Sequence, residues 1–221
     1  MTLVPDFDRF SVAPSQAPGL LRSGVGRSRL FRLAKLCADV GGALVMLPLI
    51  AVLAVLLTGL NPLINPGPLL FRQARMGQNG RTFKALKFRT MAYAPDHRGP
   101  LDPVETDRIP RLGRLLRRTG LDELPQAINI LRGEMSLIGP RPDCVRHARI
   151  FLETIPEYRQ RLSVRPGISG FAQITLGYAV GLEATREKVQ ADLDYITRAG
   201  FALDLWITWR TILNVALARG D

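Results

Sequence analysis

The sequence has few residues that could form disulfides or bind transition metals. Only two cysteines occur in 221 residues, Cys37 in an apolar run and Cys144 in a polar segment, so the chain has no disulfide framework. The two histidines, His97 and His147, have no partner at the spacing of metal ligands. A zinc site is therefore not expected. Internal repeats and low-complexity tracts are also missing from the sequence.

Acidic residues are scarce relative to basic ones. The chain has 19 Asp and Glu against 30 Lys and Arg, which gives a net charge of +11 and a pI near 10.7. This excess predicts an anionic partner: nucleic acid, an anionic membrane surface or a phosphorylated substrate. The length suits one domain, or one domain with an anchor. Residues 1–29 lack the apolar core of a signal peptide, and we expect them to form a loosely ordered arm.

Residues 36–60 form an apolar run that is long enough for a membrane segment, with Asp39 as its only charge. Pro48 lies at its middle, where it removes a helical hydrogen bond and bends the chain. Basic residues flank both ends, so a simple span would place one basic flank on the unfavoured side of the membrane. A helix that breaks at Pro48 and returns would keep both flanks on one side. The physics leaves this re-entrant hairpin and a kinked span equally open.

Residues 111–126 combine a cationic helix with two adjacent carboxylates. Arginines recur at every third position and then give way to Asp122 and Glu123. We expect a second helix to start at Thr119 or Asp122 and to end at Gly133. An ionised carboxylate at a helix start, among arginines, suits a nucleophile that faces a phosphate. Ordinary helix capping by the acidic pair is the alternative. The buried stripe of this helix is predicted to consist of Leu121, Leu124, Ile128 and Leu131.

Two further segments carry basic residues on extended or stiff backbone. Residues 69–91 predict a β-hairpin that turns around residues 78–80, with Lys87 and Arg89 on one strand face. Arg141 lies between two prolines, which restrict its backbone and suit it to a fixed phosphate clamp.

The polar loop at 92–107 and the C-terminal helix each allow two interpretations. The loop is either a mobile lid or a plain connection. Residues 201–218 predict a helix that is apolar over most of its circumference and carries Trp206 and Trp209. Such a helix lies either at a membrane interface or against the core of the domain.

In their order and spacing, these motifs resemble the bacterial sugar transferases, which are monotopic polyprenyl-phosphate glycosyl-1-phosphate transferases. The resemblance covers most of residues 35–215. The motifs that carry it include Gly67-Pro-Leu-Leu-Phe-Arg-Gln73, Lys87-Phe-Arg-Thr-Met91, Leu121-Asp-Glu-Leu-Pro-Gln126, Gly133-Glu-Met-Ser-Leu-Ile-Gly-Pro-Arg-Pro142, Pro166-Gly-Ile-Ser-Gly170 and Ala172-Gln173.

The resemblance implies transfer of a sugar phosphate from a nucleoside diphosphate sugar, usually uridine-linked, onto polyprenyl (undecaprenyl) phosphate with Mg²⁺. This reaction is the first membrane step of exopolysaccharide or other glycoconjugate synthesis. By resemblance Asp122 is the nucleophile, Glu123 assists with metal or proton handling, and both hold the metal. A re-entrant helix that breaks at Pro48 would dip into one leaflet of the bacterial inner membrane, with the active site facing the cytoplasm. The residues implied near substrate phosphates are Lys87, Arg89, Arg117 and Arg141.

We therefore expect an α+β fold that is mainly helical, in three parts. These are an N-terminal arm (1–29), a re-entrant membrane helix hairpin (30–60) and a small cytoplasmic catalytic domain with a β-hairpin and interfacial helices (61–221). The expected partners are the nucleotide sugar, polyprenyl phosphate and the lipid bilayer, without nucleic acid. The identity of the sugar and a homodimeric state stay open.

The chain departs from the family pattern at two places. Lys35-Leu36 stands where a Lys-Arg pair is usual, and Tyr178 follows Gly177 where many members have arginine. The resemblance also implies a catalytic unit with a short arm and without extra membrane helices. Two alternatives stay open: direct transfer in a ternary complex, with Asp122 only a metal ligand, and a non-enzymatic, membrane-anchored basic module that binds nucleic acid or anionic lipid.

Overall fold

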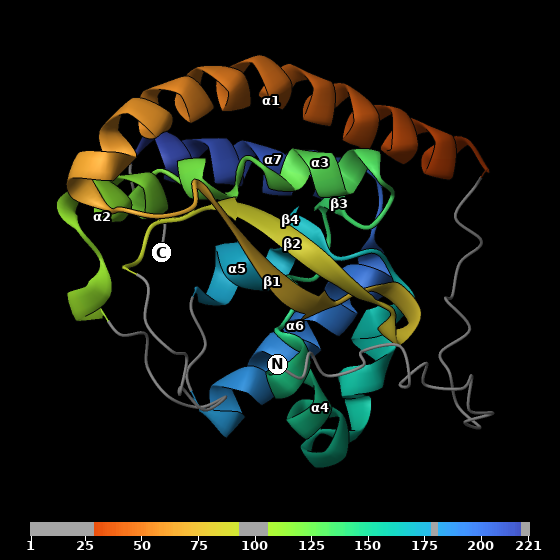
Figure 1. Cartoon of the computed structure of the whole chain (residues 1–221). Coiled ribbons are helices and arrows are strands. Elements are labelled where there is room, and N and C mark those ends of the chain that lie inside the picture. Colours follow the sequence, from red (N-terminus) through yellow and green to blue (C-terminus); the bar gives the residue numbers. More distant parts are fainter. Residues whose placement is uncertain (1–28, 93–105, 178–180, 218–221) are drawn as a thin grey trace.

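The computed structural model describes residues 29–92, 106–177 and 181–217. Nearly all of the predicted arm, most of the loop at 92–107 and Tyr178 lie outside these ranges. The fold is α+β and mainly helical, as predicted, and Figure 1 shows one long helix arching over the rest. The helices are α1 (Arg29–Ile64), α2 (Arg111–Arg118), α3 (Gln126–Leu131), α4 (Val145–Thr154), α5 (Phe171–Leu176), α6 (Leu182–Arg198) and α7 (Phe201–Ala216), and the strands are β1 (Leu70–Met76), β2 (Thr82–Phe88), β3 (Ser136–Ile138) and β4 (Gly167–Ser169).

Helix α1 runs without interruption through Pro48 and Pro62. The predicted break and return at Pro48 is not confirmed, because Figure 1 shows one curved helix in place of a hairpin. Proline fixes φ near −65°, a value that an α-helix accepts, so the loss of one hydrogen bond bends this helix without ending it. By length and composition α1 is able to cross a membrane.

Two charged side chains in the first part of α1, Lys35 and Asp39, point inward, onto the rest of the fold. Asp39 is buried and accepts hydrogen bonds from Ser136 Oγ (2.9 Å) and from the backbone N–H of Leu137 (2.8 Å). Lys35 Nζ donates to Asp204 Oδ2 on α7 (2.7 Å). These polar contacts dock the start of α1 on β3 and α7, and Ala43 and Leu57 continue its packing on the rest of the fold.

Large apolar side chains are exposed along both α1 and α7. On α7, Trp206 and Trp209 are exposed while Ile207 is fully buried, so this helix packs on the core along one narrow line only. Apolar surface of this extent marks an interaction site for protein or membrane. We call this set the apolar surface of α1 and α7; its most exposed members are Leu30, Leu33, Val45, Val52, Val55, Leu63, Phe201, Leu205, Trp209 and Ile212.

The predicted β-hairpin is confirmed. Strands β1 and β2 pair antiparallel from Leu70↔Phe88 to Met76↔Thr82. In the turn, Asn79 has φ 56° and the following glycine is also left-handed, a conformation that asparagine and glycine adopt most readily. The hairpin therefore fixes the position of every side chain on β2.

The segment after α2 does not form the single helix that we predicted. Gly120 takes φ 65°, Leu121–Glu123 form one 3-10 turn, and α3 has only six residues. Neither start has a side-chain cap from the described residues, and Asp122 lies within the three-residue turn, not at the start of α3. The predicted stripe is also wrong: Leu131 is exposed, and the buried members of α3 are Gln126, Ala127, Asn129 and Ile130.

The face that α3 buries is set by its position between α1 and β2. Asn129 Oδ1 accepts from the backbone N–H of Leu86 (3.1 Å), and its Nδ2 donates to the carbonyl of Lys84 (2.9 Å). Ala127 and Ile130 pack in one cluster with Ala43 of α1. A hydrogen-bonded polar residue thus occupies the buried side, where the pattern predicted leucines.

Strands β3 and β4 form a short parallel pair. Next to this pair the backbones at Gly139 and Gly167 approach each other closely. A Cβ on Gly167 would lie 2.2 Å from the backbone nitrogen of Gly139 and 2.4 Å from the carbonyl oxygen of Ser169. The N–H of Gly139 donates to Ser169 (2.9 Å), and the N–H of Gly167 donates to Pro140 (3.0 Å). This close crossing directs the chain into the Pro140–Pro142 segment.

The main core lies on the other side of this crossing, between α4, α6 and α7. Its fully buried members include Tyr158, Ile155, Val189 and Ile207. Tyr158 and Ile155 flank the bend at which α4 gives way to a 3-10 segment, Pro156–Ser163. The core therefore supports β3, β4 and the segment that connects them.

The crossing of Gly139 and Gly167 predicts a steric penalty. Gly167→Ala should lower the free energy of unfolding by about 1–3 kcal/mol, because the new Cβ must separate two hydrogen-bonded backbones. Urea denaturation in detergent, followed by circular dichroism, measures it. Gly41→Ala is the matched control, since a Cβ there meets nothing within 4 Å, and it should be neutral or stabilising. Equal losses in both variants would contradict the steric account.

Candidate active site

Glu123 joins the hairpin to the Pro140–Pro142 segment through two cations. Its Oε1 accepts from Lys87 Nζ (2.5 Å) and from Arg141 Nη2 (2.5 Å), and its Oε2 accepts from Arg141 Nη1 (3.0 Å). The arginine contact is bidentate, the strongest common form of an ion pair. Burial acts to raise the pKa of Glu123, but Arg141 and Lys87 outweigh burial and hold this pKa well below its usual range. Glu123 is therefore ionised and fully engaged.

Asp122 is in the opposite condition. Its side chain is buried, at 6% exposure, and its carboxylate accepts no hydrogen bond from the part of the chain that the structure describes. Burial raises the pKa of Asp122 to about 6, against the attraction of Lys87 and with the help of the negative charge of Glu123. Arg117 and Arg141 also face it closely enough to favour the ionised form. A largely buried carboxylate that accepts no hydrogen bond from the described residues, with cations around it, makes Asp122 a candidate functional residue.

The backbone that carries Arg141 is held at every carbonyl from Pro140 to Asp143. Each of these four oxygens accepts a hydrogen bond from a different part of the chain. In order, the donors are Gly167 N (3.0 Å), Arg161 Nη2 (2.7 Å), Arg75 Nη1 (2.7 Å) and Met76 N (3.0 Å). The guanidinium of Arg141 therefore leaves a rigid support, as the two prolines predicted.

A buried ion network stands behind this support, and the sequence analysis missed it. Arg161, only 2% exposed, pairs with Asp192 Oδ2 (2.6 Å) and with Asp143. Lys188 donates to Asp143 Oδ1 (2.7 Å). Burial acts to raise the pKa of Asp143, but Lys188 and Arg161 outweigh it and lower this pKa well below its usual range. Asp143, Arg161 and α6 are separated by many residues in the sequence, so no local pattern could have joined these charges.

The structure brings together most, but not all, of the predicted site residues. Asp122, Glu123, Lys87, Arg117 and Arg141 face one another across β2, the end of α2 and the Pro140–Pro142 segment. This grouping shows where a phosphate would meet positive charge, while the role of each residue stays a prediction.

Arg89 and Pro48 lie elsewhere. Arg89 follows the last residue of β2, and its guanidinium is buried against the end of α1, where it donates to Asn65 Oδ1 (2.6 Å) and the carbonyl of Pro68 (2.7 Å). The alternation of β2 predicted that Lys87 and Arg89 lie on one face. Only Lys87 contacts Glu123, because Arg89 lies beyond the end of the strand and turns toward Asn65. Pro48 lies at the middle of α1. The contact of Arg89 with a substrate phosphate stays a prediction.

The acidic pair offers carboxylate oxygens, which are the kind of donor that binds magnesium. Mg²⁺ in proteins is commonly held by one or two carboxylates, with water and substrate phosphate oxygens completing its octahedral shell. Asp122 offers free oxygens for this purpose, and Glu123 stands beside it. A group of three or more His, Cys, Asp and Glu side chains was not found among the described residues. The site therefore suits a metal that arrives with, or is shared with, a phosphate.

The pKa of Asp122 predicts a pH-dependent cost of holding its charge. Between the unfolded value of 3.8 and the folded value of about 6, only the unfolded chain releases the proton, so the folded state loses stability as pH rises. The shift corresponds to at most about 3 kcal/mol. Asp122→Asn removes this loss, so its stability relative to the native chain should rise by up to that amount from pH 4 to pH 8.

Urea denaturation of both proteins at the two pH values, in buffer with a chelator, measures this difference. Asp194→Asn makes the same chemical change on an exposed position of α6 and serves as the control. A stability difference for Asp122→Asn that does not vary with pH would show that burial does not perturb this carboxyl group.

Comparison with known proteins gives consistent relatives. A protein named UDP-glucose:undecaprenyl-phosphate glucose-1-phosphate transferase from Caulobacter vibrioides is 42% identical over 186 residues, which cover 81% of this chain and 68% of that protein. A UDP-N-acetylgalactosamine-undecaprenyl-phosphate N-acetylgalactosaminephosphotransferase from Aeromonas hydrophila is 38% identical over 194 residues, 87% of this chain and 46% of that protein. The exopolysaccharide production protein PSS of Rhizobium leguminosarum is 36% identical over 83% of this chain and 92% of its own length.

The match thus spans about half to two thirds of the length of two of these relatives and nearly all of the third. The model of the family described as bacterial sugar transferase matches residues 30–218, which include α1, the hairpin, the acidic pair and α7. The chain belongs to the bacterial sugar transferase family.

Proposed function

We propose that this protein transfers a sugar 1-phosphate from a uridine diphosphate sugar to undecaprenyl phosphate and releases uridine monophosphate. The family and the printed names of the relatives support this reaction class. The exopolysaccharide relative supports a place at the first membrane step of polysaccharide synthesis. The observation that carries the mechanism is Asp122, a buried carboxylate that has cations around it but no hydrogen-bond partner among the described residues.

The first step is an in-line displacement at the sugar-bearing phosphorus. An oxygen of ionised Asp122 forms a bond to this phosphorus, and the bond from phosphorus to the bridging oxygen breaks. The electron pair leaves with uridine monophosphate, and an aspartyl phosphosugar remains on the protein. A pKa near 6 keeps Asp122 ionised at neutral pH and makes it more basic, hence more nucleophilic, than an ordinary aspartate.

The second step returns the carboxylate to its first state. A phosphate oxygen of undecaprenyl phosphate attacks the same phosphorus, and the bond to Asp122 breaks. The product is undecaprenyl-diphospho-sugar, and the protein has neither gained nor lost a proton overall. Both steps bring an anion to an anion, so the site must supply fixed positive charge.

Three side chains supply this charge from different directions. Arg117 comes from the end of α2, Lys87 from β2 and Arg141 from its rigid support. Glu123 holds Lys87 and Arg141 in place by its ion pairs. The carboxylate of Asp122 forms no such pair with the described residues, so it stays free to attack while both cations remain near it. Magnesium held by Asp122 together with phosphate oxygens would add further charge neutralisation, and Glu123 would join it only by giving up a contact with Lys87 or Arg141.

The apolar surface of α1 and α7 supports a position of this reaction at the membrane. An association with a membrane follows from the long apolar helix and the relatives that act on undecaprenyl phosphate. We propose that α1 and α7 lie in the cytoplasmic leaflet of the bacterial inner membrane, with tryptophans of α7 at the headgroup level. The nucleotide sugar then reaches the site from water and the acceptor reaches it from lipid.

A donor-only experiment tests the nucleophile. A screen for turnover first identifies the nucleotide sugar. This compound, radiolabelled in its sugar, is then added to the protein without acceptor. The native protein should release up to one uridine monophosphate per chain and retain labelled sugar phosphate. Asp122→Asn should retain none, and its steady-state turnover should fall at least about 10³-fold, since no other group replaces the attacking oxygen.

Asp194→Asn, with the same change at an exposed site, should behave as the native protein. If the native protein releases uridine monophosphate only when the acceptor is present, direct transfer replaces the two-step mechanism. If Asp122→Asn keeps its turnover, the assignment of the nucleophile is wrong.

The position of Arg117 predicts a chemical role without a structural one. Arg117→Gln should lower kcat by about 10²–10³-fold, by analogy with the loss of one oxyanion donor, and leave the melting temperature unchanged. Arg118→Gln is the matched control, because Arg118 is the exposed neighbour on the same helix. Equal losses of kcat in both variants would indicate a general effect of charge and contradict a direct contact.

A further inference from the structure

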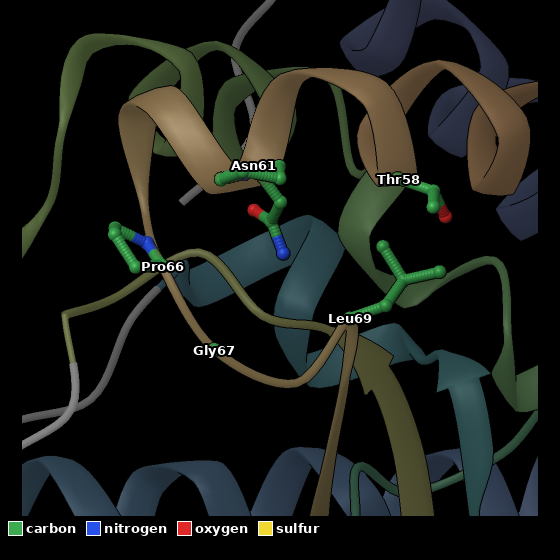
Figure 2. Close-up of a pocket in the computed structure, with 6 residues that line it drawn as sticks. Thr58, Asn61, Pro66, Gly67 and Leu69 are labelled. Atoms are coloured by element: carbon green, nitrogen blue, oxygen red, sulfur yellow. The ribbon is translucent and has the colours of Figure 1, made fainter.

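A pocket of about 430 Å³ lies between the last turns of α1 and the loop that leads to β1. Its volume falls within the range of small-molecule sites in proteins. Figure 2 shows that the loop passes below the helix and leaves a hollow between them. The pocket is lined by Thr58, Asn61, Pro62, Pro66, Gly67 and Leu69.

Thr58 and Asn61 are the polar residues of this pocket, and only Thr58 has its polar side-chain atom paired, because its hydroxyl donates to the carbonyl of Ala54 (2.7 Å). The residue is only 8% exposed, and its carboxamide makes no hydrogen bond to the part of the chain that the structure describes. In Figure 2 the carboxamide points from α1 toward the loop and Leu69, into the hollow. The amide atoms of Asn61 are not among the fully enclosed polar atoms of the described residues, so they stay open to the pocket, and a ligand oxygen there could accept a hydrogen bond from the amide nitrogen.

The other walls are suited to a hydrocarbon chain. Pro62, Pro66 and Leu69 present apolar surface, and Leu60 and Leu63 extend this surface beyond the pocket, where they are 41% and 84% exposed. These two leucines belong to the same α1 that carries the apolar surface described above. A chain that leaves the pocket would therefore continue over lipid-facing side chains.

The loop that lines the pocket is joined to Arg89, which directly follows β2, the strand that carries Lys87. A Cβ on Gly67 would lie 3.2 Å from Nη2 of Arg89, so this guanidinium packs against the loop that lines the pocket. The N–H of Arg89 donates to the carbonyl of Leu69 (2.9 Å). Lys87, which contacts Glu123, is two residues earlier on β2, about 7 Å along an extended strand.

We infer that this pocket binds the phosphate-proximal isoprene units of the polyprenyl phosphate acceptor. The amide of Asn61 donates to an oxygen at the phosphate end, Pro62 and Leu69 contact the first isoprene unit, and the chain leaves over Leu60 and Leu63 into the bilayer. The inference rests on the proposed function for its choice of lipid. The nucleotide sugar is excluded as the occupant because it lacks any apolar segment that would match these walls.

Photo-crosslinking tests the site without requiring turnover. A short isoprenyl phosphate with a photoreactive group on its first isoprene unit is added to the full chain in nanodiscs, and labelled peptides are identified by mass spectrometry. Labelling is expected within residues 58–69. Thr58→Trp should reduce it at least about 10-fold, because the indole fills the pocket from an exposed helix position and does not disturb the core. Val52→Trp, with the same bulk at another exposed position of α1, should keep it.

Kinetics then separates the pocket from the chemistry. Thr58→Trp and Asn61→Leu should raise KM for the acceptor about 10-fold or more, and should leave donor-only labelling and KM for the nucleotide sugar unchanged. Val52→Trp should change none of these values. A native protein that fails donor-only labelling would contradict the proposed mechanism, while crosslinking still decides the pocket.

Three results would overturn the inference. The first is crosslinking distributed over α1 and α7 rather than at residues 58–69. The second is an acceptor KM that is unchanged in both pocket variants. The third is competition by ordinary phospholipid that is as strong as competition by unlabelled polyprenyl phosphate, which would identify a bulk membrane lipid as the occupant.

Discussion

The contact of Glu123 with Lys87 and Arg141 is the interaction on which the site depends. It ties β2 to the Pro140–Pro142 segment and compensates two partly buried cations with one carboxylate. Two adjacent acidic residues consequently have pKa values that move in opposite directions: that of Glu123 falls because the cations outweigh its burial, and that of Asp122 rises because burial outweighs more distant cations. Environment alone divides the pair into one structural carboxylate and one available carboxylate.

The supports of this contact come from distant parts of the chain. Arg161 and Arg75 hold the carbonyls on either side of the rigid bend, and Asp143 links this bend to α6 through Lys188. Because every one of these groups is charged and largely buried, removal of one partner would leave another uncompensated. The cations of the site are therefore held rigidly, whereas the carboxylate of Asp122, which would attack the phosphorus, has no hydrogen-bond partner among the described residues.

The outer helices follow the reverse of the usual pattern for a protein in water. Lys35 and Asp39 face inward, and leucines and valines face outward along α1. This arrangement is stable where lipid replaces water at the outer surface, because the exposed apolar side chains then contact lipid and avoid the unfavourable free energy of contact with water.

The sequence predicted those features that depend on local geometry and failed where several segments meet. The hairpin at 69–91 and the helix at 201–216 follow from turn residues and periodicity, and both are present. The grouping of Asp122, Glu123, Lys87, Arg117 and Arg141 was reached through family motifs rather than through spacing.

The helix after Thr119 and the break at Pro48 were not found, for two different reasons. Left-handed Gly120 interrupts the first, and a proline bend proved compatible with a continuous helix in the second. The network around Arg161 and the unpaired amide of Asn61 required coordinates, because burial and the lack of a partner are properties of the fold and have no local pattern.

The stereochemical course at phosphorus tests the central claim most directly. Each in-line displacement inverts the configuration of the attacked phosphorus, so two displacements through Asp122 restore it. A nucleotide sugar made chiral at its sugar-bearing phosphorus with a single thiophosphate of known configuration should give a lipid-linked product with retained configuration. Inversion would mean a single displacement, with the acceptor attacking directly and Asp122 forming no bond to phosphorus.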